Sequence, residues 1–547
     1  MRLKKDSSDQ KLRGAYYTPL QLADAMVKLF VSQNIFNVLE PSCGDGVFLD
    51  ALKNLNLLNK VDKLTAVEIE IDEAEKVRER YSEIEKVEVC TDDFFNFYNR
   101  VLGKKQYDLI LGNPPYIRYQ YLSESQREMQ SQILISHGMK ANKLINTWVA
   151  FVVACVQLLA EKGKIAFVIP AEILQVAYAE DLRLYLANNL AKVTLITFEQ
   201  LVFPDIEQEV VVFIGEKGEQ EKGIRIIEMN NLDGFSKFGI SQNGFQKLKH
   251  VKEKWTKYFV NADEMALIQE LRVDKRFAKF SEYGVINVGI TTGNNGYFSI
   301  TEETSKQYQL NNVTLPLIGR SSHAHGIYFT PEDWEENKAS GKRARLISFP
   351  EIPYDEYPAK HQEYILLGER NGEHEGYKCS IRDRWYIVPS VWVPDAFFLR
   401  RNNFYPKFVL NECDAVSTDT MHRMKFNDGV DPKDILLAYY NSISFAFTEI
   451  CGRSYGGGVL EILPSEMGNI LVPKVERIDP VLRSKLLAHI DTIVRNNENI
   501  ELALDVVDKE LLIETLDINP ETCRKCRVIW KKMQKRRLGR GYNENTD

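Results

Sequence analysis

Residues 12–215 alternate short apolar runs with segments of helical periodicity, and this alternation limits the fold more than any other feature of the chain. The runs at 35–40 (IFNVLE), 63–69 (KLTAVEI) and 107–112 (YDLILG) are typical of buried strands. Between them, apolar residues recur every three or four positions, which indicates helices. Strands that alternate with helices form parallel sheets covered on both faces. We therefore predict an α/β fold with an open, mostly parallel, Rossmann-like sheet.

The same pattern continues toward residue 215. We expect a helix at 148–160 and strands at 163–170, 193–198 and 210–215. The apolar run at 148–160 is shorter than the ~20 residues that a membrane span requires. It therefore indicates a buried helix, and no membrane partner is expected.

The first helix of the region has a start signal in the sequence. Thr18 would be its N-cap, Pro19 its first helical residue, and Gln21 the partner that completes a capping box. Apolar residues at 22, 26 and 29 then keep helical spacing. We therefore predict a helix capped by Thr18.

The alternation fades after about residue 235, which indicates a change of domain. The pattern is irregular over 265–475 and becomes helical again further on. For a chain of 547 residues we predict an N-terminal α/β domain at 1–240, a mixed α/β domain at 241–475, and a helical region with a basic tail at 476–547.

Charge and cysteine content limit the partners and the compartment. The net charge is −7, so no overall basic field attracts nucleic acid, although a local basic groove is compatible with that total. Eight cysteines without disulfide-framework spacing predict a reduced, cytoplasmic protein. Cys523 and Cys526 form a CxxC with no second pair, and no metal site is predicted.

A glycine-containing turn, LEPSCGDGVF at 39–48, follows the first strand and opens a helix. Gly44 and Gly46 would let a ligand approach the backbone, but Leu49 stands where a dinucleotide fingerprint requires its third glycine. Glu68 ends the next strand, where a carboxylate can bind ribose hydroxyls. A solvated strand-end carboxylate is the alternative interpretation of Glu68. This turn disfavours NAD.

Further features describe a nucleoside pocket without a phosphate cradle. The stretch TDDFF at 91–95 ends the third strand, where a carboxylate followed by an aromatic residue can bind an adenine ring. No GxxxxGK[ST] motif is present, which disfavours ATP. S-adenosylmethionine fits these features, and Glu40 and Asp45 suit its cationic amino-acid end. No metal is needed for its chemistry.

The fourth strand ends in the turn Asn-Pro-Pro-Tyr, residues 113–116. The amide of Asn113, the carbonyl of Pro114 and the ring of Tyr116 provide two acceptors and a stacking face for an aminopyrimidine edge. Acceptors on an exocyclic amine would free its lone pair in the transition state. The alternative is a turn in which the prolines only terminate the strand.

The motifs occur in a family-specific order. GAYYTP, LEPSCGDGVFL, VEIEID, DDFF, LGNPPY and KGKIAFVIPAEIL follow one another over residues 12–175. This chain resembles the adenine-specific, amino-group DNA methyltransferases whose motifs run in the gamma order and which modify DNA in type II restriction–modification systems. The resemblance implies a class I, S-adenosylmethionine-dependent methyltransferase domain and a C-terminal target-recognition domain.

The resemblance also implies roles for individual residues. The candidate cofactor-binding residues are Thr18, Glu40, Pro41, Gly44, Asp45, Gly46, Glu68, Asp93, Phe94 and Asn113. The candidate catalytic residues, which would bind the target base, are Asn113, Pro114, Pro115, Tyr116 and Phe203. Two alternatives stay open: Asp92 in place of Asp93 at the cofactor adenine, and a core role for Phe203.

A target adenine would have to be flipped out of double-stranded DNA to reach such a pocket. The stretches at 288–298, 385–390 and 452–466 resemble recurring elements of recognition domains. We expect a monomer, paired in function with a cognate restriction endonuclease. The basic tail at 524–540 would track the DNA backbone or form a solvated helix end.

Other functions are compatible with parts of the pattern. A methyltransferase acting on an RNA base amine or a protein glutamine amide also uses an NPP-aromatic turn, but such enzymes are usually shorter. A non-catalytic DNA-specificity protein is disfavoured by the intact Asn113, Tyr116 and glycine turn. We expect no nuclease in the chain, since little sequence precedes Thr18 and EENK at 335–338 lacks a well-spaced acidic partner.

Overall fold

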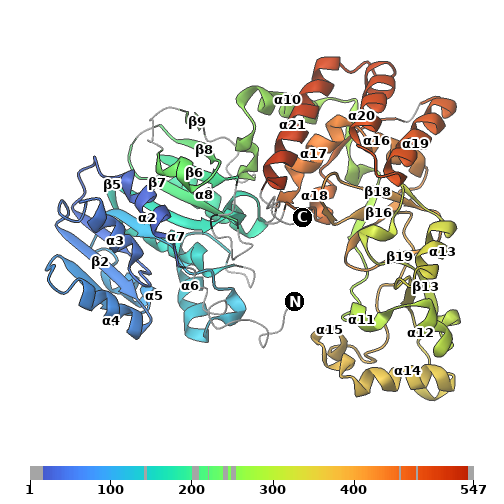
Figure 1. The fold of residues 1–547 in the computed structure, drawn as a ribbon, viewed down its shortest axis with the longest axis horizontal. Helices are drawn as coiled ribbons and strands as arrows, with labels where there is room; N and C mark the ends of the chain where they lie inside the picture. The colour runs from blue at the N-terminus through green and yellow to red at the C-terminus, as the bar shows by residue number, and fades with distance from the viewer. Residues whose placement is uncertain are drawn as a thin grey trace. The chain divides into compact units, whose positions relative to one another are not determined.

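The computed structural model describes residues 17–140, 145–199, 202, 209–219, 221–237, 244–247, 254–454, 458–475 and 478–539. Its contacts divide the chain into two compact units, Met1–Phe259 and Val260–Asp547 (Figure 1). Each unit has its own hydrophobic cores, two of them in the first unit on opposite faces of its sheet.

The first unit is built on one nine-stranded sheet with the order β3-β2-β1-β4-β5-β7-β6-β8-β9. Strands β1 to β5 run parallel to one another, and β7 lies antiparallel between β5 and β6. The strands are β1 (Asn37–Glu40), β2 (Lys63–Glu68), β3 (Val87–Thr91), β4 (Tyr107–Gly112), β5 (Leu159–Pro170), β6 (Lys192–Phe198), β7 (Val210–Glu216), β8 (Gly223–Met229) and β9 (Gln246–Lys247). The predicted mostly parallel α/β sheet is confirmed.

Helices cover both faces of this sheet, because successive residues of a strand point to opposite sides. Leu109 and Leu111 of β4 belong to one core, and Ile110 belongs to the other, with Trp148. The helices are α2 (Leu20–Lys28), α3 (Val47–Asn54), α4 (Ile71–Arg80), α5 (Phe94–Val101), α6 (Glu124–Ser136), α7 (Thr147–Leu158), α8 (Glu180–Asn189) and α9 (Leu232–Ser236). Helix α7 carries the apolar run and is buried, as predicted. No helix in the described part of the chain is both long and apolar enough to cross a membrane.

The start of α2 differs from its prediction. The helix begins at Leu20 with Pro19 as its N-cap, and no side chain caps it. The Pro19 carbonyl accepts hydrogen bonds from the backbone of Leu22 and Ala23 at 2.9 and 3.1 Å. The predicted capping box is therefore wrong. The Thr18 hydroxyl is directed to another partner, described below.

The second unit contains several small sheets and many helices. Its larger sheets have the orders β11-β20-β16-β18-β14 and β12-β15-β13-β19. The strands are β10 (Phe277–Lys279), β11 (Gly284–Val288), β12 (Ser299–Ile300), β13 (Thr314–Ile318), β14 (Tyr328–Phe329), β15 (Arg345–Ile347), β16 (Ala396–Leu399), β17 (Arg401–Asn402), β18 (Phe408–Asn411), β19 (Val416–Ser417), β20 (Met421–Phe426), β21 (Arg453–Ser454), β22 (Leu460–Glu461) and β23 (Leu471–Pro473). This agrees with the expected mixed α/β character.

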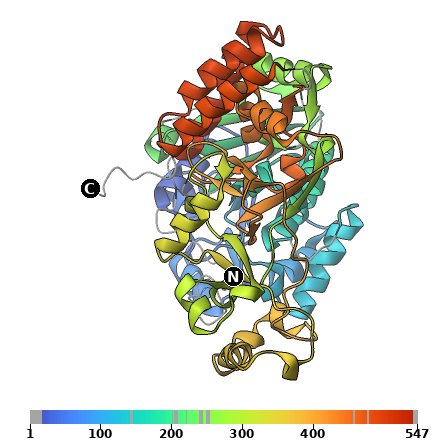
Figure 2. The same cartoon turned by 90° about the vertical axis from the view of Figure 1, so that its right-hand side faces the viewer.

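Helices of varied length connect these strands. They are α10 (Ala262–Val273), α11 (Asn295–Phe298), α12 (Glu302–Gln307), α13 (Pro331–Ala339), α14 (Ala359–Arg370), α15 (Tyr377–Ser380), α16 (Pro432–Tyr439), α17 (Ser442–Cys451), α18 (Pro464–Met467), α19 (Pro480–Arg495), α20 (Glu501–Val507) and α21 (Pro520–Leu538). Figure 2 shows α14 and α15, in amber, at the end of this unit opposite to the red helix α21.

Helix α21 contains most of the basic tail, and one of its faces packs into the largest hydrophobic core of the second unit. Cys523, Cys526 and Trp530 are buried in that core. Arg537 is buried too and pairs with Glu449 at 3.0 Å. Further cations of the helix form ion pairs with acidic residues: Arg527 with Asp508, Lys531 with Glu501, and Lys532 with Glu264. One face of α21 is therefore packed, whereas Arg524, Lys525 and Lys535 are exposed. Both roles of the tail, DNA tracking and a solvated helix end, stay predictions.

Candidate active site

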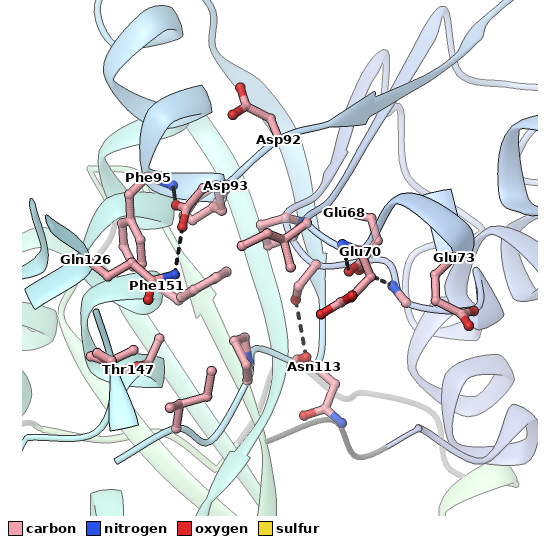
Figure 3. Close-up of a pocket in the computed structure, with 18 of the residues that line it drawn as sticks. Glu68, Glu70, Glu73, Asp92, Asp93, Phe95, Asn113, Gln126, Thr147 and Phe151 are labelled. Atoms are coloured by element: carbon pink, nitrogen blue, oxygen red, sulfur yellow. Dashed lines mark hydrogen bonds between the residues drawn. The ribbon is translucent and has the colours of Figure 1, made fainter. Parts of the chain in front are cut away.

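A cavity of about 280 Å³ lies at the carboxyl ends of β1, β2, β3 and β4, where open α/β sheets bind ligands (Figure 3). Its lining residues are Tyr17, Pro41, Ser42, Gly44, Glu68, Ile69, Glu70, Asp72, Glu73, Asp92, Asp93, Phe94, Phe95, Asn113, Pro115, Ile117, Leu122, Gln126, Gln130, Thr147 and Phe151. Six of these residues are Asp or Glu, and none is Lys, Arg or His. The cavity therefore suits a cationic ligand that carries no phosphate.

The two glycines of the β1–α3 turn have different roles. Both have positive φ, +52° at Gly44 and +84° at Gly46, which a residue with a Cβ adopts only with strain. Gly44 lines the cavity, and its backbone lies next to the ring of Tyr17. A Cβ at Gly46 would lie 3.0 Å from Val77 of α4. Gly46 therefore allows close packing of the turn against α4 and is not part of the cavity wall.

Glu68 holds the glycine turn in place. Its Oε2 accepts a hydrogen bond from the Gly44 backbone at 2.8 Å, and its Oε1 accepts one from the Glu70 backbone at 2.9 Å (Figure 3). Burial raises the pKa of Glu68, and these bonds oppose the shift because they favour the charged form. The carboxylate borders the cavity at the end of β2, the position expected for a ribose-binding residue. The alternative of a solvated strand-end carboxylate is wrong.

Asp92 and Asp93 face different partners. Asp93 caps α5 through a bond from the Phe95 backbone at 2.8 Å, and its other oxygen accepts from Gln126 Nε2 at 3.1 Å. Asp92 pairs with Arg100 at 2.8 Å. Figure 3 shows the Asp93 carboxylate turned toward Gln126 and the Asp92 carboxylate turned away from it. Asp93 is therefore the better placed of the two to bind a ligand beside α6.

The aromatic side of the cavity is formed by Phe94 and its neighbours. Phe94 is 3% exposed and stacks on Phe151 with ring centroids 4.6 Å apart. Phe95 and Phe151 meet edge to face. With Ile117 and Pro115, these rings give the cavity an apolar surface suited to a flat ring.

The Asn-Pro-Pro-Tyr turn leaves β4 beside the cavity. Asn113 donates from Nδ2 to the hydroxyl of Thr18 at 3.2 Å, and its backbone carbonyl accepts a hydrogen bond from the Ser42 hydroxyl at 3.3 Å. Tyr116 donates its hydroxyl to the carbonyl of Val168 on β5 at 3.0 Å. The turn is thereby fixed to the segment before α2, to the glycine turn and to β5.

The predicted turn residues do not all border the cavity. Asn113 and Pro115 line it, whereas Pro114 is buried and Tyr116 packs against both hydrophobic cores of the unit. Phe203 lies outside the described residues.

Glu40 is a buried carboxyl group next to this turn. It is 1% exposed, and its Oε2 has no hydrogen-bond partner among the described residues. Burial raises the pKa of Glu40 well above its usual value, and the charges of Asp45 and Glu68 raise it further. Thr18, Glu40, Asp45 and Gly46 do not line the cavity, whereas the predicted cofactor residues Pro41, Gly44, Glu68, Asp93, Phe94 and Asn113 do.

Several lining residues were not among the sequence candidates. Tyr17 precedes the Thr-Pro motif, Gln126 is the third residue of α6, and Phe151 belongs to the apolar run of α7. Gln126 completes a capping box with Ser123, so its spacing signals a helix start and gives no sign of the contact with Asp93. The packing of α6 and α7 against α5 brings Gln126 and Phe151 to the cavity.

Comparisons with known proteins identify relatives of this chain. Residues 26–203 match the family model described as Eco57I restriction-modification methylase, and residues 252–512 match the model of the C-terminal domain of the type II methyltransferase M.Eco57I. The type II methyltransferase M.AccI of Acinetobacter calcoaceticus is 23% identical over 525 residues, which are 91% of this chain and 92% of that protein. M.HincII of Haemophilus influenzae is 32% identical over 227 residues, 41% of each chain.

A solved structure shares the fold over almost the whole chain. The type IIL restriction-modification enzyme MmeI, solved in complex with DNA, has a TM-score of 0.53 and 15% identity, and the match covers 99% of this chain and 78% of that one. The family models and the relatives, on this α/β sheet, define a methyltransferase of the α/β class. Within that class, the chain belongs to the type II restriction–modification methyltransferases of the Eco57I family.

Proposed function

We propose that this methyltransferase transfers a methyl group from S-adenosylmethionine to the N6 amine of adenine in double-stranded DNA. The observation that carries the proposal is the position of the Asn113 turn, which borders an acidic cavity with an aromatic wall. The names of the relatives, type II methyltransferases, support DNA as the substrate class. The modified sites would then be protected from a cognate restriction endonuclease.

The cavity residues fit S-adenosylmethionine, which supplies an activated methyl group. Phe94 and Phe151 offer an apolar wall to its adenine, and Asp93 offers an acceptor to the adenine amine. Glu68 and Glu70 lie where ribose hydroxyls can donate. A sulfonium ion is attracted by the six acidic residues of the lining, and these same residues would repel phosphates.

The turn residues would act on the target amine. The Asn113 side-chain oxygen and the Pro114 carbonyl are acceptors for the two amine hydrogens, and accepting them localises the nitrogen lone pair. The Tyr116 hydroxyl is held by Val168, which fixes the ring for stacking on a flipped base. Phe203 stays a candidate for the second stacking face. Neither a metal nor a strong base is required by this arrangement, and a monomer would suffice for it.

The acceptor class is tested by methyl transfer from tritiated S-adenosylmethionine. Methylation-free plasmid DNA, ribosomal RNA and a protein extract serve as parallel acceptors for the full chain. Label in DNA alone is the expected result. Label in RNA or protein but not in DNA would overturn the proposal, and so would cofactor binding without transfer to any acceptor, the behaviour of a DNA-specificity protein.

A further inference from the structure

A second cavity, of about 670 Å³, lies entirely within the second unit. Its walls come from the loop after β13, the segment before β15, the α11–β12 region and the loop between β19 and β20, which Figure 1 shows in one part of the unit. The lining residues are Asn295, Gly296, Ser299, Gly319, Arg320, Ser322, His323, Lys342, Arg343, Thr418 and Thr420. The lining contains three cations and no carboxylate, the opposite of the methyltransferase cavity.

Two of the three cations have neutral hydrogen-bond partners in the structure: Lys342 bonds to Asn337 and Arg343 to the carbonyl of Gly296. Arg320, Lys342 and Arg343 form no ion pair with any residue that the structure describes. Arg345, two positions further along, pairs with Glu302 at 2.6 Å. The cavity is therefore a locally positive site, although the chain as a whole carries a net charge of −7.

Lys342 is held in place by a buried scaffold. Asn337 of α13 is fully buried, accepts a hydrogen bond from Lys342 Nζ at 2.7 Å, and donates to the carbonyl of His323 at 3.0 Å. Thr420 in turn donates to the carbonyl of Gly319 at 3.1 Å. Side-chain hydrogen bonds therefore join the walls that carry the cations, and the site is preformed in the absence of a ligand.

His323 provides a neutral element of the wall. It is 4% exposed, and its Nδ1 accepts from the backbone of Gly319 at 3.2 Å. Burial, with the nearby charges of Lys342 and Arg320, lowers the pKa of His323 to about 4. The imidazole is therefore uncharged near neutral pH, and the three exposed or half-buried cations carry the charge of the site.

We propose that this cavity binds a phosphate group of the DNA backbone, with Arg320, Lys342 and Arg343 as its charged ligands. A phosphodiester presents only acceptor oxygens, and this lining offers cations and the hydroxyls of residues such as Ser322 and Thr418. A base edge presents donors as well and would require acceptors in the wall. The inference rests on the proposed function in taking DNA as the partner, and it adds the residues that anchor the backbone.

The salt dependence of DNA binding tests this inference. The full chain is titrated onto a fluorescent duplex that carries a site methylated by the wild type, from about 50 to about 200 mM salt. Each of the variants R320Q, K342Q and R343Q should lower the slope of log K against log salt by about 0.9. The fold-change in Kd across this range then shrinks by about 3.5-fold per variant. K433Q, an equal charge loss on the exposed start of α16, is the matched control and should keep the wild-type slope.

The outcomes separate this inference from the proposed function. Reduced slopes with an unchanged set of methylated sites support phosphate binding, since phosphate contacts carry no sequence information. Wild-type slopes in all three variants overturn the inference alone. Wild-type slopes with altered methylated sites also overturn it, in favour of base reading. A wild type that does not bind DNA overturns both. Arg320 and Arg343 are exposed, so their variants keep the test valid if K342Q fails to fold.

Discussion

The side chain of Asn113 donates a hydrogen bond to the hydroxyl of Thr18 at 3.2 Å, which joins two motifs that lie 95 residues apart in the sequence. Thr18 is buried, and it does not border the cavity that Asn113 lines. The bond uses the amide nitrogen, so it orients the oxygen of the same amide. Thr18 is therefore a positioning residue for the group that we propose to bind the target amine.

Substitution of Thr18 tests this orientation. T18V keeps the shape of the side chain and removes the acceptor, so we expect the kcat of methyl transfer to fall about tenfold, the equivalent of one neutral hydrogen bond. The Kd for S-adenosylmethionine should stay within about twofold. T18S retains the hydroxyl and should restore kcat. Equal loss of kcat in T18V and T18S would show that the Thr18 hydroxyl does not position Asn113.

Asp93 and Asp92 give a matched pair of variants for cofactor binding. D93N should weaken S-adenosylmethionine binding about tenfold, because a hydrogen bond to a charged acceptor contributes roughly 1.5–3 kcal/mol. D92N removes a carboxylate that is directed at Arg100 and should change the Kd by less than about twofold. Isothermal titration calorimetry measures both. The assignment of Asp93 is wrong if D92N has the larger effect.

Glu40 predicts a pH dependence of stability. Its pKa is raised in the folded protein, so the folded state holds the proton more tightly than the unfolded chain does. The free energy of unfolding that Glu40 contributes is therefore complete below the unfolded-state pKa, near 4.5, and is lost as the pH rises toward the folded-state value. Glutamine cannot ionise, so its contribution to the free energy of unfolding does not fall as the pH rises.

The E40Q variant should accordingly raise the Tm relative to wild type at about pH 8 and show little difference below the unfolded-state pKa. Thermal unfolding followed by circular dichroism at several pH values gives the comparison. The same Tm difference at every pH would contradict a buried, protonated Glu40.

The ion pair between Glu449 and Arg537 predicts a strong effect on folding. Both side chains are almost fully buried, so E449A leaves an uncompensated guanidinium in the core. We expect the free energy of unfolding to fall by about 3–5 kcal/mol. Urea denaturation measures it, and R524A, which breaks an exposed pair on the same helix, should have little effect. Similar stability of E449A and wild type would show that α21 is not anchored by this pair.

The sheet and part of the site could be predicted from the sequence because they depend on local patterns. The apolar runs predict the strands. Because ligands bind at the carboxyl ends of parallel strands, Glu68, Asp93 and Asn113 are predicted to line one site, and they do. Gln126 and Phe151 were missed because they reach the cavity through the packing of α6 and α7. The spacing of residues in the sequence does not indicate how these two helices pack.

The errors have equally specific causes. Thr18 and Gln21 have the spacing of a capping box, but tertiary partners engage both side chains: Asn113 donates to Thr18, and Gln21 donates to Asp233 at 2.6 Å. The burial of one face of the basic tail was not predicted, because the acidic residues that pair with it, such as Glu264 and Glu449, lie far away in the sequence. Local charge indicates neither burial nor partners.

The Asn113 turn is proposed to bind the adenine amine of DNA that receives the methyl group of S-adenosylmethionine. The most direct measurement is the identity of the modified nucleoside after the full chain and S-adenosylmethionine have acted on methylation-free duplex DNA, read by mass spectrometry for wild type and N113A. We expect N6-methyladenine with the wild type and its loss with N113A, while N113A still binds the cofactor. Methylcytosine as the product, or undiminished N6-methyladenine with N113A, would contradict it.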